Sequence, residues 1–460
     1  MSKLHDLLDD IRLGKKSPVK HMSSAKIIAL GYLIIIFIGA VLLSLPVASK
    51  GTPPTFLDSV FTATSATCVT GLVVFDTYTQ WSVFGQIVII LLIQTGGMGF
   101  MTIISLTAMA TGRKIGLKER SVLQDSVNNG QIGGIVRLMK KIALGTFIIE
   151  GIGTLLFMTR FIPEMGIAEG IWNSVFLSIS AFCNAGFDLN GKYGEYCSLV
   201  PFADDVIVNF TASFLILTGG IGFAVWDDIA QHKWHISSYR LHSKIVLVMT
   251  AGLTVVGAIL FFLFELDYTI REMSVSDGVL ASLFSAVTPR TAGFNTVDTA
   301  ALSPASKLLT IMYMFVGGSP GSTAGGVKTV TVAVLFLSAV AEMKNNYDVN
   351  VFGRRLEEDV PAKALTVIVI NLSLAFAAII AITAIQPELG LTDITFEAFS
   401  AVNTVGMTTG ITRELNALSR MIIILLMYSG RVGSVSFALI FTRTKKYTGV
   451  HNPVEQVSIG

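Results

Sequence analysis

Residues 56–72 read FLDSVFTATSATCVTGL, a short apolar segment that ends in a polar loop with a glycine. Long apolar segments lie on both sides of it, and the same arrangement occurs four times along the chain. Four such units around one axis would place four glycine backbones at the narrowest point of a pore. The equivalent loops read Thr67-Cys68-Val69-Thr70-Gly71-Leu72, Cys183-Asn184-Ala185-Gly186-Phe187, Arg290-Thr291-Ala292-Gly293-Phe294 and Asn403-Thr404-Val405-Gly406-Met407.

The composition places the chain in a bilayer. Of its 460 residues, 52% are hydrophobic and 14% charged, against about 45–50% and about 25% in soluble domains. Eight stretches are long enough to cross about 30 Å of hydrocarbon as helices: 27–45, 83–110, 135–158, 206–226, 245–264, 308–340, 365–384 and 421–442. Shorter apolar pieces lie between the two members of each pair, at 56–66, 170–182, 275–287 and 391–402.

The predicted fold class is therefore an all-α integral membrane protein. It consists of four helix, re-entrant pore loop, helix repeats, with eight transmembrane helices and four half-helices around a central pseudo-fourfold pore. Non-helical backbone at membrane depth survives only where it is buried in protein or lines water, so the four loops should face one another. The predicted divisions are an N-terminal segment at 1–26, repeats at 27–112, 135–232, 243–345 and 362–443, and a C-terminal tail at 444–460.

The distribution of basic residues predicts the topology. Lys15, Lys16 and Lys20 precede the first span, which lacks a small-residue cleavage signal, so it is predicted to remain as a helix. Lysine and arginine also concentrate in every second loop, as the positive-inside rule demands. We therefore expect a multi-pass protein of the cell membrane with cytosolic N- and C-termini. The net charge of +2 follows from this topology and gives no indication of nucleic-acid binding.

The glycine loops have the chemistry of a cation filter. Backbone carbonyls can replace the hydration shell of a cation, and glycine allows the positive φ angles that such a loop needs. A single glycine is equally well explained as an ordinary turn, but four at equivalent places favour a filter. The predicted filter comprises Thr67, Cys68, Val69, Thr70, Gly71, Asn184, Ala185, Gly186, Thr291, Ala292, Gly293, Thr404, Val405 and Gly406.

A second cluster predicts a gate. The long third-unit span is interrupted by a run that cannot continue a helix, and we expect this intramembrane gating loop, residues 317–327, to lie beneath the filter. Arg431 lies in the middle of the last apolar stretch, where a charge usually faces a partner or a water-filled path. We expect it to bond to carbonyls of the loop. The predicted gate comprises Gly317, Gly318, Ser319, Pro320, Gly321, Ser322, Thr323, Ala324, Gly325, Gly326, Lys328 and Arg431.

Several alternatives accompany these assignments. The run from Gly321 to Thr329 superficially matches a phosphate-binding loop, but Val327 separates Gly326 from Lys328 and no strand is predicted before it. Arg431 could instead reach the lipid headgroups, and Lys328 could do so with equal odds.

Polar residues outside these two clusters have structural interpretations. Glu150 is predicted to be buried with a hydrogen-bonding partner or at a dimer contact rather than to relay protons, and Gln94 and Asn371 to donate interhelical hydrogen bonds. The six histidines fall outside the predicted spans and form no catalytic cluster with acids or serines in the sequence, so we expect no enzyme. The three cysteines have no metal-ligand or disulfide spacing.

The four loops, their order and the ending Asn452-Pro453-Val454-Glu455-Gln456-Val457-Ser458-Ile459-Gly460 resemble the Trk/Ktr/HKT superfamily of K⁺ transport proteins, and within it the membrane subunits of bacterial Ktr systems. The resemblance covers essentially the whole chain. Met407 departs from it, since leucine is more usual after the fourth glycine. In the superfamily a serine at the first filter glycine accompanies Na⁺ preference, so Gly71 points to K⁺ at the filter carbonyls.

The resemblance also implies partners. It implies a homodimer in the lipid bilayer, with one pore per protomer, assembled with a cytosolic nucleotide-binding ring of the KtrA type. It implies Na⁺ as an activator, a nucleotide bound by the partner rather than by this chain, and no covalent cofactor. The alternative within transport is a Na⁺-permeable or Na⁺/K⁺ cotransporting relative. A membrane-embedded scaffold is the alternative from another class, but it would not need four glycine-bearing loops.

Overall fold

The computed structural model describes residues 24–99, 101–103, 105, 116, 123, 135–346, 348–433 and 455. Within them the chain is mostly helical, as predicted. Four predicted parts lie wholly or partly outside the described residues. They are the N-terminal segment up to residue 23, positions 100, 104 and 106–110 of the 83–110 span, positions 434–442 of the 421–442 span, and all of the 444–460 tail but residue 455.

The helices follow one another in the predicted order. The first half of the chain contains α2 (Ser24–Leu43), η2 (Pro46–Ala48), α3 (Phe56–Cys68), α4 (Thr77–Gln80), α5 (Val83–Met98), α8 (Ile135–Met165), α9 (Ile167–Cys183), η3 (Asn190–Lys192), η4 (Val200–Phe202), α10 (Val206–Gly220) and α11 (Phe223–His232). The second half contains η5 (Ile236–Ser238), α12 (Leu241–Glu265), α13 (Val275–Val287), α14 (Pro304–Phe315), α15 (Thr329–Met343), the antiparallel pair β1 (Asn350–Val351) and β2 (Arg354–Arg355), α16 (Val360–Ile385), α17 (Leu391–Val402), η6 (Ile411–Arg413) and α18 (Ala417–Val432).

The four short helices α3, α9, α13 and α17 coincide with the four short apolar pieces of the sequence. The bounds of α13 and α17 are those predicted, and α3 and α9 extend theirs by a few residues. The Thr55 hydroxyl caps α3 by accepting from the Asp58 amide, and the Ser274 hydroxyl caps α13 by accepting from the Asp277 amide. Each of these helices is largely buried, because longer helices surround it.

Helix length supports fewer spans than the predicted eight. In the described part of the chain, α2, α8, α12 and α16 are long and apolar enough to cross a bilayer alone, and α10 with α11 passes the same test as a pair bent by 96°. The predicted span at 206–226 is therefore two helices. The third-unit stretch 308–340 is likewise split into α14 and α15, as its glycines and proline predict.

Glycines of similar conformation lie at or near the ends of the second helices of three units. Gly99 after α5, Gly222 between α10 and α11, and Gly433 after α18 all have positive φ angles, of 79°, 94° and 91°. Left-handed or extended positive-φ backbone is cheap only for glycine and ends the helix. In the third unit the segment 316–328 replaces this single glycine.

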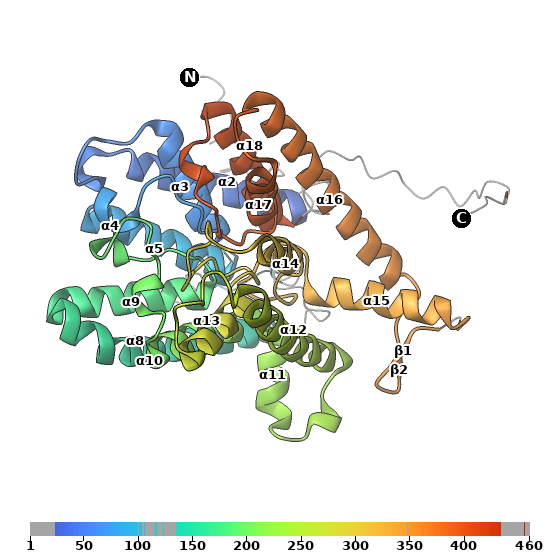
Figure 1. Cartoon of the computed structure of the whole chain (residues 1–460). Helices are drawn as coiled ribbons and strands as arrows, with labels where there is room; N and C mark the ends of the chain where they lie inside the picture. Colours follow the sequence, from blue (N-terminus) through green and yellow to red (C-terminus); the bar gives the residue numbers. More distant parts are fainter. Residues whose placement is uncertain are drawn as a thin grey trace, which may run out of the picture.

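The units are arranged in sequence order around a centre, and the last returns to the first (Figure 1). The α18 helix packs against α2 and α3. There the Arg420 guanidinium donates to the Asp58 carboxylate at 2.6 Å, and the Tyr428 hydroxyl donates to the Ala29 carbonyl at 2.8 Å. The two ends of the helical chain therefore close a ring.

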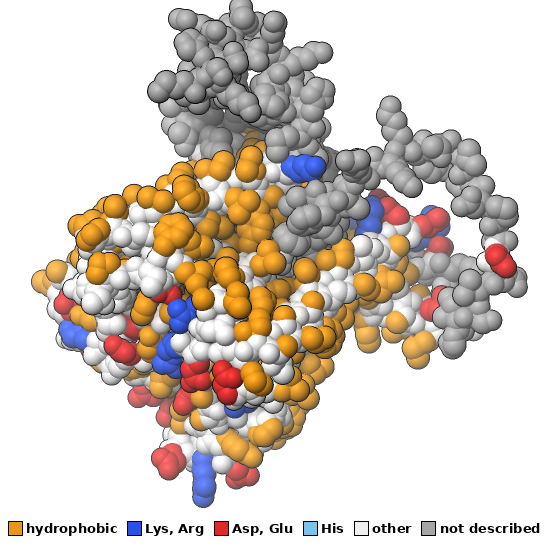
Figure 2. Space-filling model, turned by 90° about the horizontal axis from the view of Figure 1, so that it is seen from above, with side chains coloured by type: hydrophobic (Ala, Val, Ile, Leu, Met, Phe, Trp, Pro, Cys, Tyr) orange, Lys and Arg blue, Asp and Glu red, His pale blue; other side chains and the backbone are white. Residues whose placement is uncertain are grey.

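The surface is apolar where it would meet lipid. Figure 2 shows hydrophobic side chains over most of the visible face, with acidic and basic side chains gathered in patches. Leu144, Leu155 and Ile380 on α8 and α16 are each more than 60% exposed. Such an exposed apolar belt suits hydrocarbon and would be a liability in water.

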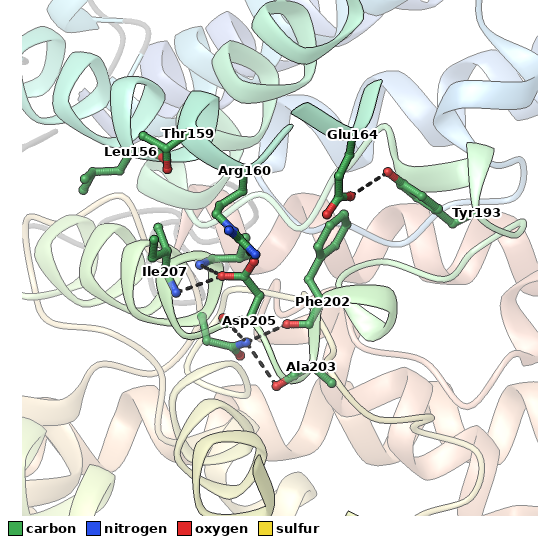
Figure 3. A network of polar contacts seen from close by, with 11 residues as sticks. Leu156, Thr159, Arg160, Glu164, Tyr193, Phe202, Ala203, Asp205 and Ile207 are labelled. Carbon is green, nitrogen blue, oxygen red and sulfur yellow. Dashed lines mark hydrogen bonds and ion pairs between the residues drawn. The ribbon is translucent and has the colours of Figure 1, made fainter. Parts of the chain in front are cut away.

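Polar contacts join the helix ends beyond this belt. Near the end of α8 the Arg160 Nε donates to the Asp205 carboxylate at 2.5 Å, and the Tyr193 hydroxyl donates to Glu164 at 3.0 Å (Figure 3). Asp205 also accepts from the Ile207 and Val208 amides and so caps α10. One carboxylate thus ties α8 to the start of α10.

Candidate functional site

The four glycine loops, residues 67–72, 183–187, 290–294 and 403–407, have the same backbone conformation. Gly71, Gly186, Gly293 and Gly406 have φ angles of 96°, 69°, 83° and 94°. The residue two positions before each glycine is also left-handed, at Val69, Asn184, Thr291 and Thr404 with φ angles of 57°, 59°, 70° and 52°. Non-glycine residues rarely adopt this conformation, so its fourfold recurrence marks four equivalent loops.

Side-chain hydroxyls from the short helices hold the loops in this shape. Ser65 and Ser400 each accept from the amide of their loop glycine at 3.1 Å, and Ser180 accepts from the Phe187 amide at 3.0 Å. In the third loop the Thr288 hydroxyl donates to the Phe294 carbonyl at 2.5 Å. A buried hydroxyl bound to loop backbone fixes the loop without help from solvent.

The four glycines meet one another in sequence order. A Cβ added to Gly71 would lie 3.1 Å from the Gly186 Cα, and one added to Gly186 would lie 3.1 Å from the Gly293 Cα. The corresponding distances are 3.2 Å from Gly293 to the Gly406 Cα and 2.9 Å from Gly406 to the Gly71 Cα. The loops therefore form a closed ring of backbone with no room for side chains at the glycines.

A cavity of about 280 Å³ opens above this ring, and all four glycines line it. Its walls carry the carboxylates of Asp76, Asp188 and Asp298, opposed by Arg413. The arginine guanidinium stacks over the Tyr196 ring at 4.3 Å. A cavity with three acids and one base favours cations near the ring.

Two of these acids have defined surroundings. Asp76 caps α4 through its Oδ1 and accepts from the Tyr196 amide through its Oδ2, which ties the first unit to the second. Asp188 lies just beyond the second loop. Its burial raises its pKa from 3.8 to about 7; the backbone amide of Asn190 lowers the pKa, and the nearby Asp76 raises it further.

The segment 317–327 lies against loop residues that precede the glycines and against the end of α10. The Ser319 amide donates to the Gly220 carbonyl at 2.9 Å, and the Val327 amide donates to the Asn403 side chain at 3.3 Å. A Cβ on Gly325 would lie 2.0 Å from the Thr404 hydroxyl oxygen. The segment therefore contacts the second and fourth units as well as its own.

Arg431 and Lys328 both contact this segment. Arg431 Nη1 donates to the Thr323 carbonyl at 2.5 Å, and its Nη2 donates to the Gly96 carbonyl and to Gly97 at 3.3 Å. Lys328 Nζ donates to the carbonyls of Ala324 at 2.6 Å and of Gly325 at 3.0 Å. Both cations thus point into the protein rather than toward headgroups, and Arg431 joins the first, third and fourth units.

The remaining polar predictions had mixed outcomes. Glu150 is 4% exposed and accepts from Gln94 Nε2 at 3.2 Å, so both the burial of the acid and the interhelical bond are confirmed. Asn371 was wrongly assigned, because its amide donates at 2.9 Å to Val367 one turn earlier in the same helix. Hydrogen bonding to its own helix satisfies the donor without a neighbour.

Sequence reasoning missed part of the cavity. Asp76 and Arg413 lie outside the loop motifs and carry no periodic signal, and only the fold brings them together. Among the described residues, no group of three or more His, Cys, Asp or Glu could hold a metal ion.

Comparisons with known proteins agree over nearly the whole chain. A family model described as TrkH, cation transport protein, matches residues 15–448. The chain is 39% identical over 437 residues to the Ktr system potassium uptake protein B of Bacillus subtilis, covering 95% of this chain and 96% of that one. It is 38% identical over 453 residues to the potassium/sodium uptake protein NtpJ of Enterococcus hirae, covering 97% and 99%.

A solved structure has the same fold. The crystal structure of the potassium transporter TrkH from Vibrio parahaemolyticus matches with a TM-score of 0.72 and 18% identity, covering 93% of this chain and 87% of that one. At this identity the likeness concerns the fold alone.

Proposed function

Because this chain belongs to the TrkH family of cation transport proteins, we propose that it is the membrane subunit of a Ktr-type K⁺ uptake system. K⁺ enters the cavity lined by Asp76, Asp188 and Asp298, loses its water to backbone carbonyls of the four glycine loops, and passes into the cell. Permeation is channel-like, and the predicted filter residues are those of the loops.

The observation that carries this proposal is the closed ring of Gly71, Gly186, Gly293 and Gly406 at the base of the cavity. Each loop follows the C-terminus of a short helix, whose dipole contributes about half a negative charge. Several such ends directed at one point stabilise a dehydrated cation without a buried carboxylate. Glycines in ordinary turns between helices would not need to meet at one point.

The segment 317–327 acts as the gate in this proposal. It lies on the inner side of the loops and is held by Arg431 and Lys328, whose charges oppose the passage of a cation. A cytosolic nucleotide-binding ring of the KtrA type moves it, and Na⁺ activates the assembly. We place the protein as a homodimer in the cell membrane, with both termini cytosolic and repeats at 27–112, 135–232, 243–345 and 362–443.

Gly71→Ser and Gly293→Ser test the filter. A Cβ at Gly71 would lie 2.6 Å from the Ala185 carbonyl oxygen and strain a φ of 96°, so the ring must widen. Uptake of Rb⁺ and Na⁺ is measured in a K⁺-uptake-deficient bacterium, with and without the cytosolic subunit. We expect the preference for Rb⁺ over Na⁺ to fall about tenfold, the factor for 1.4 kcal/mol of differential binding.

Gly252→Ser is the matched control, because a Cβ there meets nothing within 4 Å. It should transport as the parent chain does. An unchanged flux ratio in folded Gly71→Ser and Gly293→Ser would contradict the filter. If deficient cells carrying the parent chain grow only on high external K⁺, with and without the cytosolic subunit, K⁺ uptake itself is contradicted.

A Na⁺-permeable transporter is the second candidate. The relative from Enterococcus hirae, named a potassium/sodium uptake protein, favours it. The same flux measurement on the wild-type chain decides, since comparable Rb⁺ and Na⁺ uptake would establish this alternative.

A further inference from the structure

Arg413 is an exposed arginine in the wall of the cavity above the ring of glycine loops. It ends η6 and lines the cavity together with all four ring glycines. Its Cζ lies 4.3 Å from the centroid of the Tyr196 ring, and its Nε donates to the Gly410 carbonyl at 3.3 Å. Because Tyr196 and Gly410 also line the cavity, these two contacts place the guanidinium at the cavity itself.

Contacts from three units hold Arg413 in this place. Its carbonyl accepts from Arg420 Nη2 at 3.2 Å, which anchors its backbone to α18 of the fourth unit. Tyr196 belongs to the second unit and is itself fixed to the first. Its amide donates to the Asp76 carboxylate at 3.0 Å, and its hydroxyl donates to the Val74 carbonyl at 3.2 Å. The guanidinium therefore has a defined position at the cavity wall.

Within the described part of the chain, no ion pair includes Arg413. Its contacts are an aromatic ring and a backbone carbonyl, which hold the cation without cancelling its charge. The cavity wall thus carries one full positive charge beside the carboxylates of Asp76, Asp188 and Asp298. For gathering K⁺ alone, such a charge is a disadvantage, so the entry of monovalent cations does not account for it.

A positive charge in a cation entrance discriminates between ions by their valence. The local concentration of an ion depends exponentially on the product of its charge and the electrostatic potential. A potential that lowers the concentration of a monovalent cation by some factor therefore lowers that of a divalent cation by the square of this factor. Carboxylates alone would act in the opposite sense, and Mg²⁺ and Ca²⁺ also prefer carboxylate oxygens as ligands.

We propose, building on the proposed function, that Arg413 is a specificity residue that keeps divalent cations out of the cavity above the glycine ring. The three carboxylates concentrate cations of every valence. The guanidinium reduces the concentration of divalent cations more than that of K⁺, so that they do not occupy the cavity and block K⁺ entry. Arg413 acts through the field in the cavity and does not touch the permeating ion.

The experiment measures two constants for each variant. They are the KM of Rb⁺ uptake and the inhibition constant of external Mg²⁺, in a K⁺-uptake-deficient bacterium that produces the full chain with its cytosolic subunit. Choline chloride keeps the ionic strength constant, because added salt would otherwise screen the field. Arg413→Gln removes the charge, Arg413→Lys keeps it, and Tyr196→Leu removes the stacking partner. Arg271→Gln is the control, at an exposed arginine that is not among the residues lining the cavity.

We expect Arg413→Gln to lower the KM for Rb⁺ about twofold and the inhibition constant of Mg²⁺ about fourfold, the square of the monovalent factor. Arg413→Lys and Arg271→Gln should leave both constants within about 1.5-fold of the parent values. Tyr196→Leu should lower the inhibition constant of Mg²⁺ by less than Arg413→Gln does, because the charge is still present.

An unchanged inhibition constant of Mg²⁺ in Arg413→Gln would overturn the inference. Equal factors for Rb⁺ and Mg²⁺ would also overturn it, because they would indicate a changed cavity shape rather than a changed field. A loss in Tyr196→Leu as large as that in Arg413→Gln would indicate a packing role. If Arg413→Gln does not fold, Arg413→Met removes the same charge and is judged by the same outcomes. Absence of Rb⁺ uptake by the parent chain would refute the proposed function instead, so the two failures are distinct.

Discussion

The backbone positions of the four ring glycines impose two requirements that only glycine meets. The four are Gly71, Gly186, Gly293 and Gly406. Each has a positive φ angle, and each lies where a Cβ would come within 3.2 Å of the next glycine Cα around the ring. The first requirement concerns local backbone and was predictable from the loop motif. The second depends on four segments far apart in the sequence.

At the residue scale, Asp188 predicts a dependence on external pH. Its raised pKa of about 7 means that the cavity loses one negative charge as the pH falls through neutrality. We expect Rb⁺ uptake to fall about two- to threefold between pH 8 and pH 6, because the local cation concentration drops. Asp188→Asn should have the low uptake at both pH values, and the exposed Asp267→Asn should behave as the parent chain.

A loss of folded protein at low pH would not explain this fall in Rb⁺ uptake, because protonation of Asp188 stabilises the fold. A carboxyl whose pKa is higher in the folded chain, about 7, than its ordinary value of 3.8 binds its proton more tightly when folded. Acidification between these values therefore stabilises the fold through this group, and stability declines as the pH rises through 7. Rb⁺ uptake by Asp188→Asn that still falls on acidification would contradict the assignment.

At the element scale, the breaks in the second helices are as informative as the helices. Gly96, Gly219 and Gly430 lie where a Cβ would come 2.0, 2.0 and 2.2 Å from carbonyl oxygens near the ends of α3, α9 and α17. Each of these second helices thus lies directly against the end of a short helix. The small residues and the interruption at 317–327 were predictable from glycine and proline content.

Shortening the 317–327 segment, or Arg431→Ala, tests the gate. Arg431 donates to carbonyls on the segment and on α5. A hydrogen bond from a charged group is worth about 1.5–3 kcal/mol, so its loss shifts a blocked–open equilibrium about tenfold or more toward open. We expect higher Rb⁺ uptake, less dependent on the cytosolic subunit. Arg354→Ala, on the exposed β2 strand, is the control.

Lower or unchanged uptake by folded Arg431→Ala protein would count against gating. The contact itself was foreseen from the position of the charge within an apolar stretch. The attachment of Arg431 to Gly96 and Gly97 was not foreseen, because nothing in the fourth unit indicates which helix of the first unit lies beside it.

At the scale of the whole molecule, the ring depends on the contact between its first and last units. The Asp58 and Arg420 side chains are 6% and 19% exposed and 2.6 Å apart. Consecutive units are joined by the chain, whereas the first and last are joined by packing, by this ion pair and by hydrogen bonds from Tyr428 and Arg431. The four repeats were visible in the sequence; the closure between the first and fourth was implied only by the predicted symmetry.

Breaking the pair should destabilise the fold. We expect Arg420→Met to lower the free energy of unfolding by about 2 kcal/mol, because it leaves Asp58 buried without its cation. Thermal unfolding in detergent measures it. The double variant Asp58→Asn with Arg420→Met should recover part of the loss. The exposed pair of Arg355 with Asp348, 56% and 47% accessible, is the control, and Arg355→Met should have almost no effect. Equal losses of unfolding free energy in Arg420→Met and Arg355→Met would refute the role of the Asp58–Arg420 pair in closing the ring.

The third loop, which Thr288 holds where serines hold the other three, illustrates a freedom that comes with building such a ring from a single polypeptide. In an assembly of four identical subunits, any substitution would appear in every subunit, so all four loops would change at once. Here one codon alters one quarter of the circle, so one loop can differ from the other three in a way that a symmetric tetramer does not allow.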